Sequence, residues 1–245
     1  MNYLDELTNT LLKGDISFDK LEDILQKYET FFDNIDLEIE LLKSNGYPIY
    51  IHNNNISLKT RKTPIEDQVF CIVDIEVSSP SIQTGQIIEI GAIRYKNGKI
   101  LEKYNTLVNG LHIPYVVQKI TSITPDMLEN APHLRTVLEE FKIFVDDDII
   151  VAHNINFDYK YLSKSLDYFD LGKLANRSLC TIELSKKLFK TSKYGLKYLC
   201  EFFDIKNSHH HRAYDDAYNT SIIFGKCLEK LPKEIKTVED LINFR

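Results

Sequence analysis

The sequence lacks paired cysteines, long apolar runs and the features of a secretion signal. Its four cysteines are widely spaced and form no C-x-x-C pair, which indicates buried thiols in a reduced compartment. No apolar run approaches the length that a bilayer requires, and the amino terminus shows neither the basic nor the apolar stretch of a secretion signal. We therefore expect a cytoplasmic protein without a membrane partner.

Positive charge is also scarce, since 36 acidic residues outnumber 30 lysines and arginines and the formal net charge is -6. This balance argues against a protein whose whole surface binds nucleic acid, although it leaves room for a local basic groove. The 245 residues carry no repeats or low-complexity tracts. They suffice for one large α/β domain, or for a medium domain with a small one.

Residues 1–64 are predicted to form a small helical domain. Three short stretches carry apolar residues at helical spacing, and two apolar segments flank the turn-rich His52–Asn55, which predicts a β-hairpin. The predicted elements are helices near 4–11, 21–28 and 35–42, followed by strands near 47–51 and 56–59. Three helices and a hairpin resemble a winged helix, and Leu42–Ile49 is similar to the helix-to-wing junction of biotin-ligase repressors.

The charge of this domain argues against DNA reading. Residues 1–45 contain eleven acids and four lysines, and the helix that would read DNA, near 36–43, is acidic and would repel phosphates. We therefore expect a structural role or the docking of a protein, such as a polymerase subunit. DNA reading remains the less favoured alternative.

Residues 65–245 are predicted to form an α/β domain, because the charged, aperiodic segment 59–68 around Pro64 separates two different patterns. Strands near 70–77, 87–95 and 100–108 form a meander at its start. Helices are predicted from about 124, along the apolar stripe 134–145, over 156–169, and from about 196, 214 and 238, with short strands at 149–152 and 179–182.

Two acids stand in the first of these strands, in the otherwise apolar run Phe70–Val77. A strand alternates its faces, so the side chains of Asp74 and Glu76 point the same way. Two ionised carboxylates so close to each other cost several kcal/mol, roughly, unless a cation neutralises them, and a divalent metal is the simplest such partner. A lone Asp-x-Glu more often marks a strand edge or turn, so the interpretation depends on acids elsewhere.

Two further fragments supply such acids. His153–Asp158 runs from the end of a strand through a polar turn and puts Asp158 in the first turn of a helix. In His211–Asp216 a loop histidine precedes an acid by five positions at another helix start. Strand ends and helix starts are where α/β sheets build their sites.

Asp74-x-Glu76 and these two fragments are similar to the three motifs of the DEDDh, or DnaQ-like, family of 3′-to-5′ exonucleases, which includes the epsilon proofreading subunits of bacterial polymerases. The resemblance extends over residues 70–225 and implies an RNase H-like fold, with a mixed sheet flanked by helices. It further implies two Mg²⁺ or Mn²⁺ ions and a histidine as general base, a role that suits an imidazole at neutral pH. The implied metal ligands are Asp74, Glu76, Asp158 and Asp216, and the implied base is His211.

Rival residues and departures from the family pattern qualify this assignment. His209 and His210 read as solvated loop residues or a soft-metal site, and Asp215 has the chemistry of Asp216 but points about 100° away on a helix.

Val77-Ser78-Ser79 stands where the family usually has Thr-Thr-Gly, and Ser122 where it has Gly, which puts the grip on the substrate in doubt. By analogy, the terminal nucleotide is expected against Val77, Ser78, Ile123, Asn154 and Phe157, although core packing is an equal alternative for Phe157.

The leading functional hypothesis is a metal-dependent exonuclease that removes nucleoside 5′-monophosphates from single-stranded or frayed DNA 3′ ends, in proofreading or repair. A 3′-to-5′ exoribonuclease of the same fold, similar to RNase T, is the alternative. A third hypothesis is a catalytically idle scaffold that binds a polymerase through residues 1–64, which the five intact catalytic positions disfavour.

Overall fold

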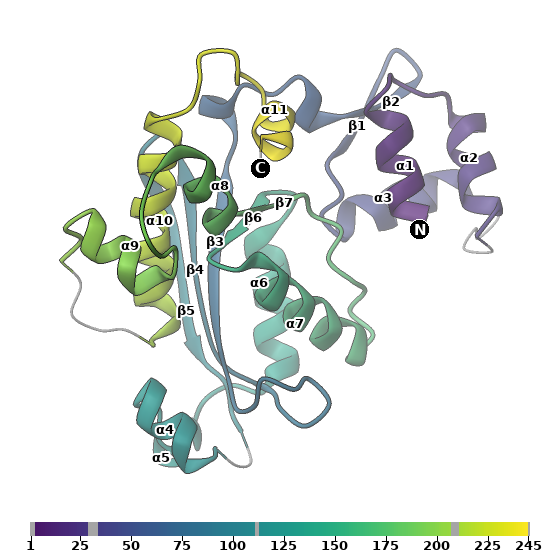
Figure 1. Ribbon diagram of the computed structural model, residues 1–245. Coiled ribbons are helices and arrows are strands. Elements are labelled where there is room, and N and C mark those ends of the chain that lie inside the picture. The colour runs from purple at the N-terminus through teal and green to yellow at the C-terminus, as the bar shows by residue number, and fades with distance from the viewer. Residues whose placement is uncertain (1–2, 29–33, 111–112, 207–210, 245) are drawn as a thin grey trace.

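The computed structural model describes residues 3–28, 34–110, 113–206 and 211–244, and Figure 1 shows them as two unequal parts. The smaller part, in purple and blue, contains the first three helices and a two-stranded hairpin. The larger part is built around a five-stranded sheet. No helix within these ranges is long and apolar enough to cross a membrane.

The smaller part has the three helices and the hairpin that the sequence predicts. Its elements are α1 (Tyr3–Leu11), α2 (Phe18–Gln26), α3 (Ile35–Ser44), β1 (Ile49–His52) and β2 (Asn55–Leu58). The side chain of Ser17 caps α2 and that of Asn34 caps α3, each by accepting a backbone N–H three residues on. Asn53 and Asn54 both have positive φ, the conformation that a two-residue hairpin turn requires. The winged-helix resemblance stays a prediction.

Polar contacts join the two parts along the connecting segment, which contains the short 3₁₀ turns η1 (Lys59–Arg61) and η2 (Ile65–Asp67). The Thr60 hydroxyl donates to the buried carboxylate of Glu239, 2.6 Å away. Across the same junction, Lys142 Nζ donates to Asn45 Oδ1 at 3.0 Å. The core of the smaller part nevertheless takes only Ala175 from beyond residue 58, among the described residues.

The sheet of the larger part is mixed, as predicted. Its strands are β3 (Phe70–Val77), β4 (Ile87–Lys96), β5 (Lys99–Leu107), β6 (Ile149–Ala152) and β7 (Ser178–Cys180), in the spatial order β5-β4-β3-β6-β7. The first three strands are antiparallel, whereas β6 and β7 run parallel to β3. Because β6 pairs only with Phe70–Ile72, the second half of β3 has no strand on that edge.

Helices cover both faces of the sheet, and β3 alternates between them. Cys71, Val73 and Ile75 belong to one core, with α6 (Leu134–Val145) and α7 (Ile155–Tyr168). Phe70 and Ile72 belong to the other core, with α10 (Ala213–Glu229). That second core also includes residues of α8 (Thr181–Leu188), α9 (Leu196–Phe202) and α11 (Val238–Asn243). Because side chains alternate between the two faces along a strand, Asp74 and Glu76 lie on the same face as Phe70 and Ile72, which α10 covers.

The structure also differs from the sequence prediction in several elements. The helix expected from about 124 is the single turn α5 (Pro125–Leu128), separate from α6. The short helix α4 (Tyr115–Thr121), which follows Pro114, was not expected. The strand expected at 179–182 ends at Cys180, where α8 begins, because Thr181 and Ser185 are buried together with Leu184 on one helical stripe. Buried hydroxyls conceal such a stripe from an apolar periodicity.

Candidate active site

Two carboxylates lie on β3 near its open end. Asp74 and Glu76 are half-buried, so that an ion from solvent can reach them. Burial raises the pKa of Asp74 well above its ordinary value, and repulsion by Asp158, Asp216 and Glu76 raises it further. Burial and the same kind of repulsion raise the pKa of Glu76 to about 8. The mutual repulsion indicates that the four predicted acids share one region.

Asp158 reaches β3 from the first turn of α7 and is 4% exposed. Burial raises its pKa to about 8, while hydrogen bonds from its own backbone N–H and that of Ile75 oppose this rise. Ile75 stands between Asp74 and Glu76, on the half of β3 that lacks a neighbouring strand. The shortness of β6 thus leaves room for the start of α7 beside the carboxylates.

The start of α10 brings in the third fragment. Asp216 is the fourth residue of α10 and is 7% exposed, and its Oδ2 accepts the backbone N–H of His211 at 3.0 Å. His211 has the left-handed φ of 67° that aims its backbone at this carboxylate. Ligand atoms of Glu76, His211 and Asp216 lie within 4.8 Å of one another.

One contributor to the site was missed by sequence reasoning. The carboxylate of Glu89 on β4 is 1% exposed and accepts bonds from Arg212 at 2.6–3.1 Å and from the Ala213 backbone N–H at 3.0 Å. Two residues along the strand, Gly91 has no side chain, and a Cβ there would lie 2.2 Å from the backbone N of Tyr214. Glu89 and Gly91 therefore hold the start of α10 directly against β4. The buried Glu inside an apolar strand was the available signal.

The predicted substrate residues differ in how far they are exposed to solvent. Asn154 is exposed and begins α7 in a left-handed conformation without a side-chain cap bond, so its amide faces outward. Phe157 is half-buried with its ring centroid 5.7 Å from that of Tyr161. Val77 is half-buried against the core, and the Ser78 hydroxyl accepts the N–H of Gln86 at 3.0 Å.

Ile123 is fully buried in a small core with three other apolar residues. Ser122 has a positive φ of 59° at the end of α4, where the family usually has glycine. His209 and His210 lie outside the described residues, and Asp215 is half-buried one position before Asp216.

The donor set suits a hard divalent cation. It consists of carboxylate oxygens and one imidazole, and no thiolate belongs to the group that the structure gathers within the described residues. Three of these acids, Asp74, Glu76 and Asp158, form no ion pair with any residue that the structure describes. A cation is what such a cluster needs to hold its charge.

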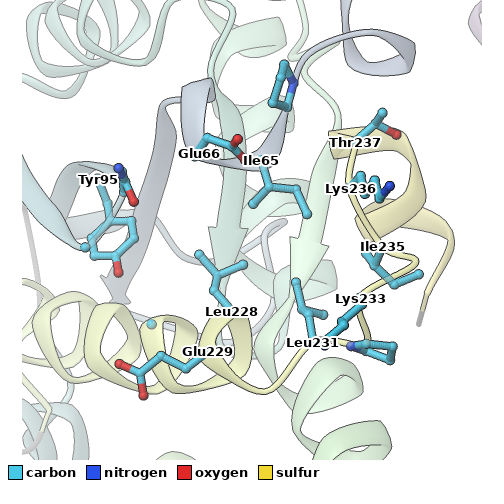
Figure 2. Close-up of a pocket in the computed structure, with 15 residues that line it drawn as sticks. Ile65, Glu66, Tyr95, Leu228, Glu229, Leu231, Lys233, Ile235, Lys236 and Thr237 are labelled. Atoms are coloured by element: carbon cyan, nitrogen blue, oxygen red, sulfur yellow. The ribbon is translucent and has the colours of Figure 1, made fainter.

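A cavity at the other end of the sheet offers no comparable chemistry. A cavity of about 770 Å³ lies between the end of β4 and the segment after α10. Figure 2 shows Tyr95, Leu228 and Ile235 among the residues that line it. Tyr95 pairs with Phe70 at the start of β3, so this cavity lies far along the strand from Glu76. Its two acids, Glu66 and Glu229, come with Lys233 and Lys236.

Comparisons with known proteins agree with the motifs. A model of the RNase T type, described as exonuclease, matches residues 71–224. The DNA polymerase III subunit epsilon of Aquifex aeolicus is 38% identical over 177 residues, covering 71% of this chain and 87% of the relative. The PolC-type DNA polymerase III of Caldanaerobacter subterraneus is 38% identical over 200 residues, but this chain spans only 14% of it.

Solved structures show the same fold. Exonuclease X in complex with 5′ overhanging duplex DNA is similar with a TM-score of 0.58 and 24% identity, covering 71% of this chain and 98% of that one. E. coli exonuclease I in complex with a dA16 oligonucleotide is similar with a TM-score of 0.60 and 15% identity, covering 68% and 42% of the two chains. At these identities the likeness concerns the fold.

Proposed function

The chain belongs to the DnaQ-like exonuclease family and is a 3′-to-5′ exonuclease, a phosphodiester hydrolase, and from this premise we propose that its substrate is the 3′ end of single-stranded or frayed DNA. It would release nucleoside 5′-monophosphates in proofreading or repair. The observation that carries the proposal is the gathering of Glu76, His211 and Asp216 beside carboxyls whose pKa values are raised. The similarity to an epsilon subunit supports DNA over RNA.

We further propose roles for the acids. Asp74, Glu76, Asp158 and Asp216 would hold two Mg²⁺ or Mn²⁺ ions, which supply charge neutralisation at the attacking and leaving oxygens of an in-line displacement at phosphorus. The donor set supports this assignment, because hard cations prefer carboxylate oxygens. The backbone N–H of Ile75 keeps Asp158 directed at β3.

His211 would accept the proton of the attacking water. Its backbone N–H is tied to Asp216, and the next residue, Arg212, is tied to Glu89, which restricts the imidazole to the edge of the acid cluster. Histidine is the side chain that most often serves as a general base in enzymes. Asn154 and Phe157, at the start of α7, would hold the terminal nucleotide.

The domain division at residue 64 and a role for residues 1–64 in docking a protein are also proposals. The acidic surplus of residues 1–45 supports a protein partner, such as a polymerase subunit, over DNA. A winged-helix-like architecture is compatible with three helices and a hairpin. A cytoplasmic location is proposed from the buried, unpaired thiols.

The test compares matched DNA and RNA oligonucleotides labelled at the 5′ end, incubated with the full chain and Mg²⁺. We expect ladders that shorten from the 3′ end on DNA, release of 5′-monophosphates, and no reaction with Asp74→Asn or with chelator. Faster shortening of RNA would replace this proposal with an exoribonuclease. Absence of hydrolysis on both would support the idle scaffold.

A further inference from the structure

A groove leads away from the terminal-nucleotide residues between α7 and the loop 78–86. One cavity of about 390 Å³ reaches Asn154 and Phe157, and a second of about 760 Å³ reaches Ser78 and Tyr168. Both are lined by Ile82, Gln83 and Lys164, so the two cavities adjoin along the helix, and together they are called the groove. The groove thus begins at the site where the 3′ nucleotide is proposed to bind.

The loop is a fixed wall of this groove. Its ends are closed by two bonds between Ser78 and Gln86, of 2.9 and 3.0 Å. The Tyr161 hydroxyl donates to the carbonyl of Ser79 at 3.1 Å and so fastens the loop to α7. Gly85 packs against the same hydroxyl, because a Cβ there would lie 2.6 Å from it. A wall held in this way keeps the groove open without a ligand.

The helical wall presents positive charge and aromatic surface. Lys160 and Lys164 are exposed and one turn apart, with Phe157 at one end of their stripe and Tyr168, which is 82% exposed, at the other. Neither lysine forms an ion pair with a described residue. No Asp or Glu occurs among the described residues lining either cavity, in a chain whose acids outnumber its lysines and arginines.

We propose that this groove binds the single-stranded DNA on the 5′ side of the terminal nucleotide, with Lys160 and Lys164 on its phosphates and Tyr168 stacked on a base. The inference rests on the proposed function and extends it to the path of the strand. Lysines that neutralise phosphates and aromatics that stack on bases are the usual means of sequence-independent binding. From Phe157 to Tyr168 the helix rises about 16 Å, room for roughly five nucleotides of stacked strand.

The test separates the groove from the catalytic centre by substrate length. A chromogenic nucleotide ester, p-nitrophenyl thymidine 5′-monophosphate, occupies only the terminal site, whereas oligothymidylates of 2 to 12 residues extend into the groove. For Lys160→Gln combined with Lys164→Gln, we expect KM for the 12-mer to rise about tenfold with kcat unchanged, and the salt dependence of log KM to weaken by about 0.7 per lysine. Tyr168→Ala should raise KM for the 12-mer severalfold and leave that for the dinucleotide unchanged.

Lys99→Gln, at the start of β5 and at the other end of the sheet, is the control and should behave as the parent does. The groove proposal is overturned if the parent degrades the 12-mer and the double variant keeps the parent's KM and salt dependence. It is equally overturned if the double variant loses hydrolysis of the ester, because the lysines would then serve the terminal site. If the parent hydrolyses neither substrate, the proposed function itself fails.

Discussion

The two ends of the central sheet treat buried acids in opposite ways. At the end where β6 begins, the carboxylate of Asp148 is 2.8 Å from Arg94 Nε, and Glu239 is paired with Arg177. At the end where β3 stops, Asp74, Glu76 and Asp158 gather without an ion pair among the described residues. The sheet thus has a neutralised end and an unneutralised end.

The pKa values record this difference. Burial raises the pKa of Asp148 to about 6, and Arg94 limits the rise. Burial raises the pKa of Glu76 and of Asp158 to about 8; repulsion by Asp216 and Glu89 adds to the rise at Glu76, and neither carboxylate forms an ion pair with a described residue. Acids paired with arginine stabilise the fold, whereas acids kept close together without a partner cost stability and indicate a function.

The largest effect should come from removing one charge at each end. We expect Asp158→Asn to lower kcat about a thousandfold, since metal-ion catalysis contributes several kcal/mol, and to raise the melting temperature of the metal-free protein by relieving repulsion. Asp148→Asn is the matched change at the neutralised end and should keep kcat within about twofold while losing roughly 1–3 kcal/mol of stability. Oligonucleotide hydrolysis and thermal unfolding measure both. Equal loss of activity in the two variants would show that the two ends of the sheet do not differ in their importance for catalysis.

Replacing the imidazole should have the next largest effect. His211→Ala should lower kcat by about 100-fold, the lower range for loss of a general base, with little change in the Mg²⁺ concentration that half-saturates the rate. His52→Ala, an exposed histidine of the hairpin, is the control. A shift mainly in the Mg²⁺ requirement would instead make His211 a metal ligand.

Metal and pH should act together on stability. The pKa of Glu76 and of Asp158 is about 8 in the folded chain, whereas it is about 4 in the unfolded chain. The stability that each carboxyl contributes is therefore fully present below about pH 4 and is lost as the pH rises through about 8. The metal-free protein should therefore lose stability at this end between these pH values, and divalent ions should restore it. At one fixed concentration, about 100 times its dissociation constant at pH 8, Mg²⁺ should raise the melting temperature by about 5–10 °C at pH 8 and much less at pH 5.5, where it binds more weakly. An equal rise at both pH values would contradict the assignment.

The smallest effect should come from Glu89, the acid that has an arginine yet lies at the unneutralised end. Glu89→Gln should lower kcat about tenfold and raise the Mg²⁺ requirement, because Arg212 and Ala213 lose a charge-assisted anchor and the start of α10 is held less firmly against β4. Titration of the rate with Mg²⁺ measures this. A variant that is only less stable, with an unchanged Mg²⁺ requirement, would show that Glu89 acts on the fold alone.

The family resemblance implied the mixed sheet and its flanking helices, while local patterns predicted the long strands β3, β4 and β5 and the apolar stripe of α6. The local patterns failed at α4 and α8, which are short and bury hydroxyls as well as apolar side chains. Short helices are stabilised mainly by contacts with neighbouring elements, and the apolar periodicity of the segment itself carries no information about those neighbours.

For the site, local spacing predicted that Asp74 and Glu76 share a face, and the motifs supplied the remaining acids. The Glu89–Arg212 contact joins positions far apart in the chain, and no local pattern specifies it. The same holds for the bond from Ile75 to Asp158, which exists because β6 stops early. These tertiary facts determine how the acids meet, and the roles of the individual site residues remain proposals.

The early end of β6 has a consequence for solubility. The second half of β3 is an uncovered strand edge inside an otherwise paired sheet, and such an edge is a template for adding a foreign strand. The start of α7 occupies it, and the carboxylate of Asp158 accepts the backbone N–H of Ile75, which has no partner strand on that side. The residue proposed to hold a catalytic ion therefore also takes up the hydrogen-bonding position on β3 that an added strand would need.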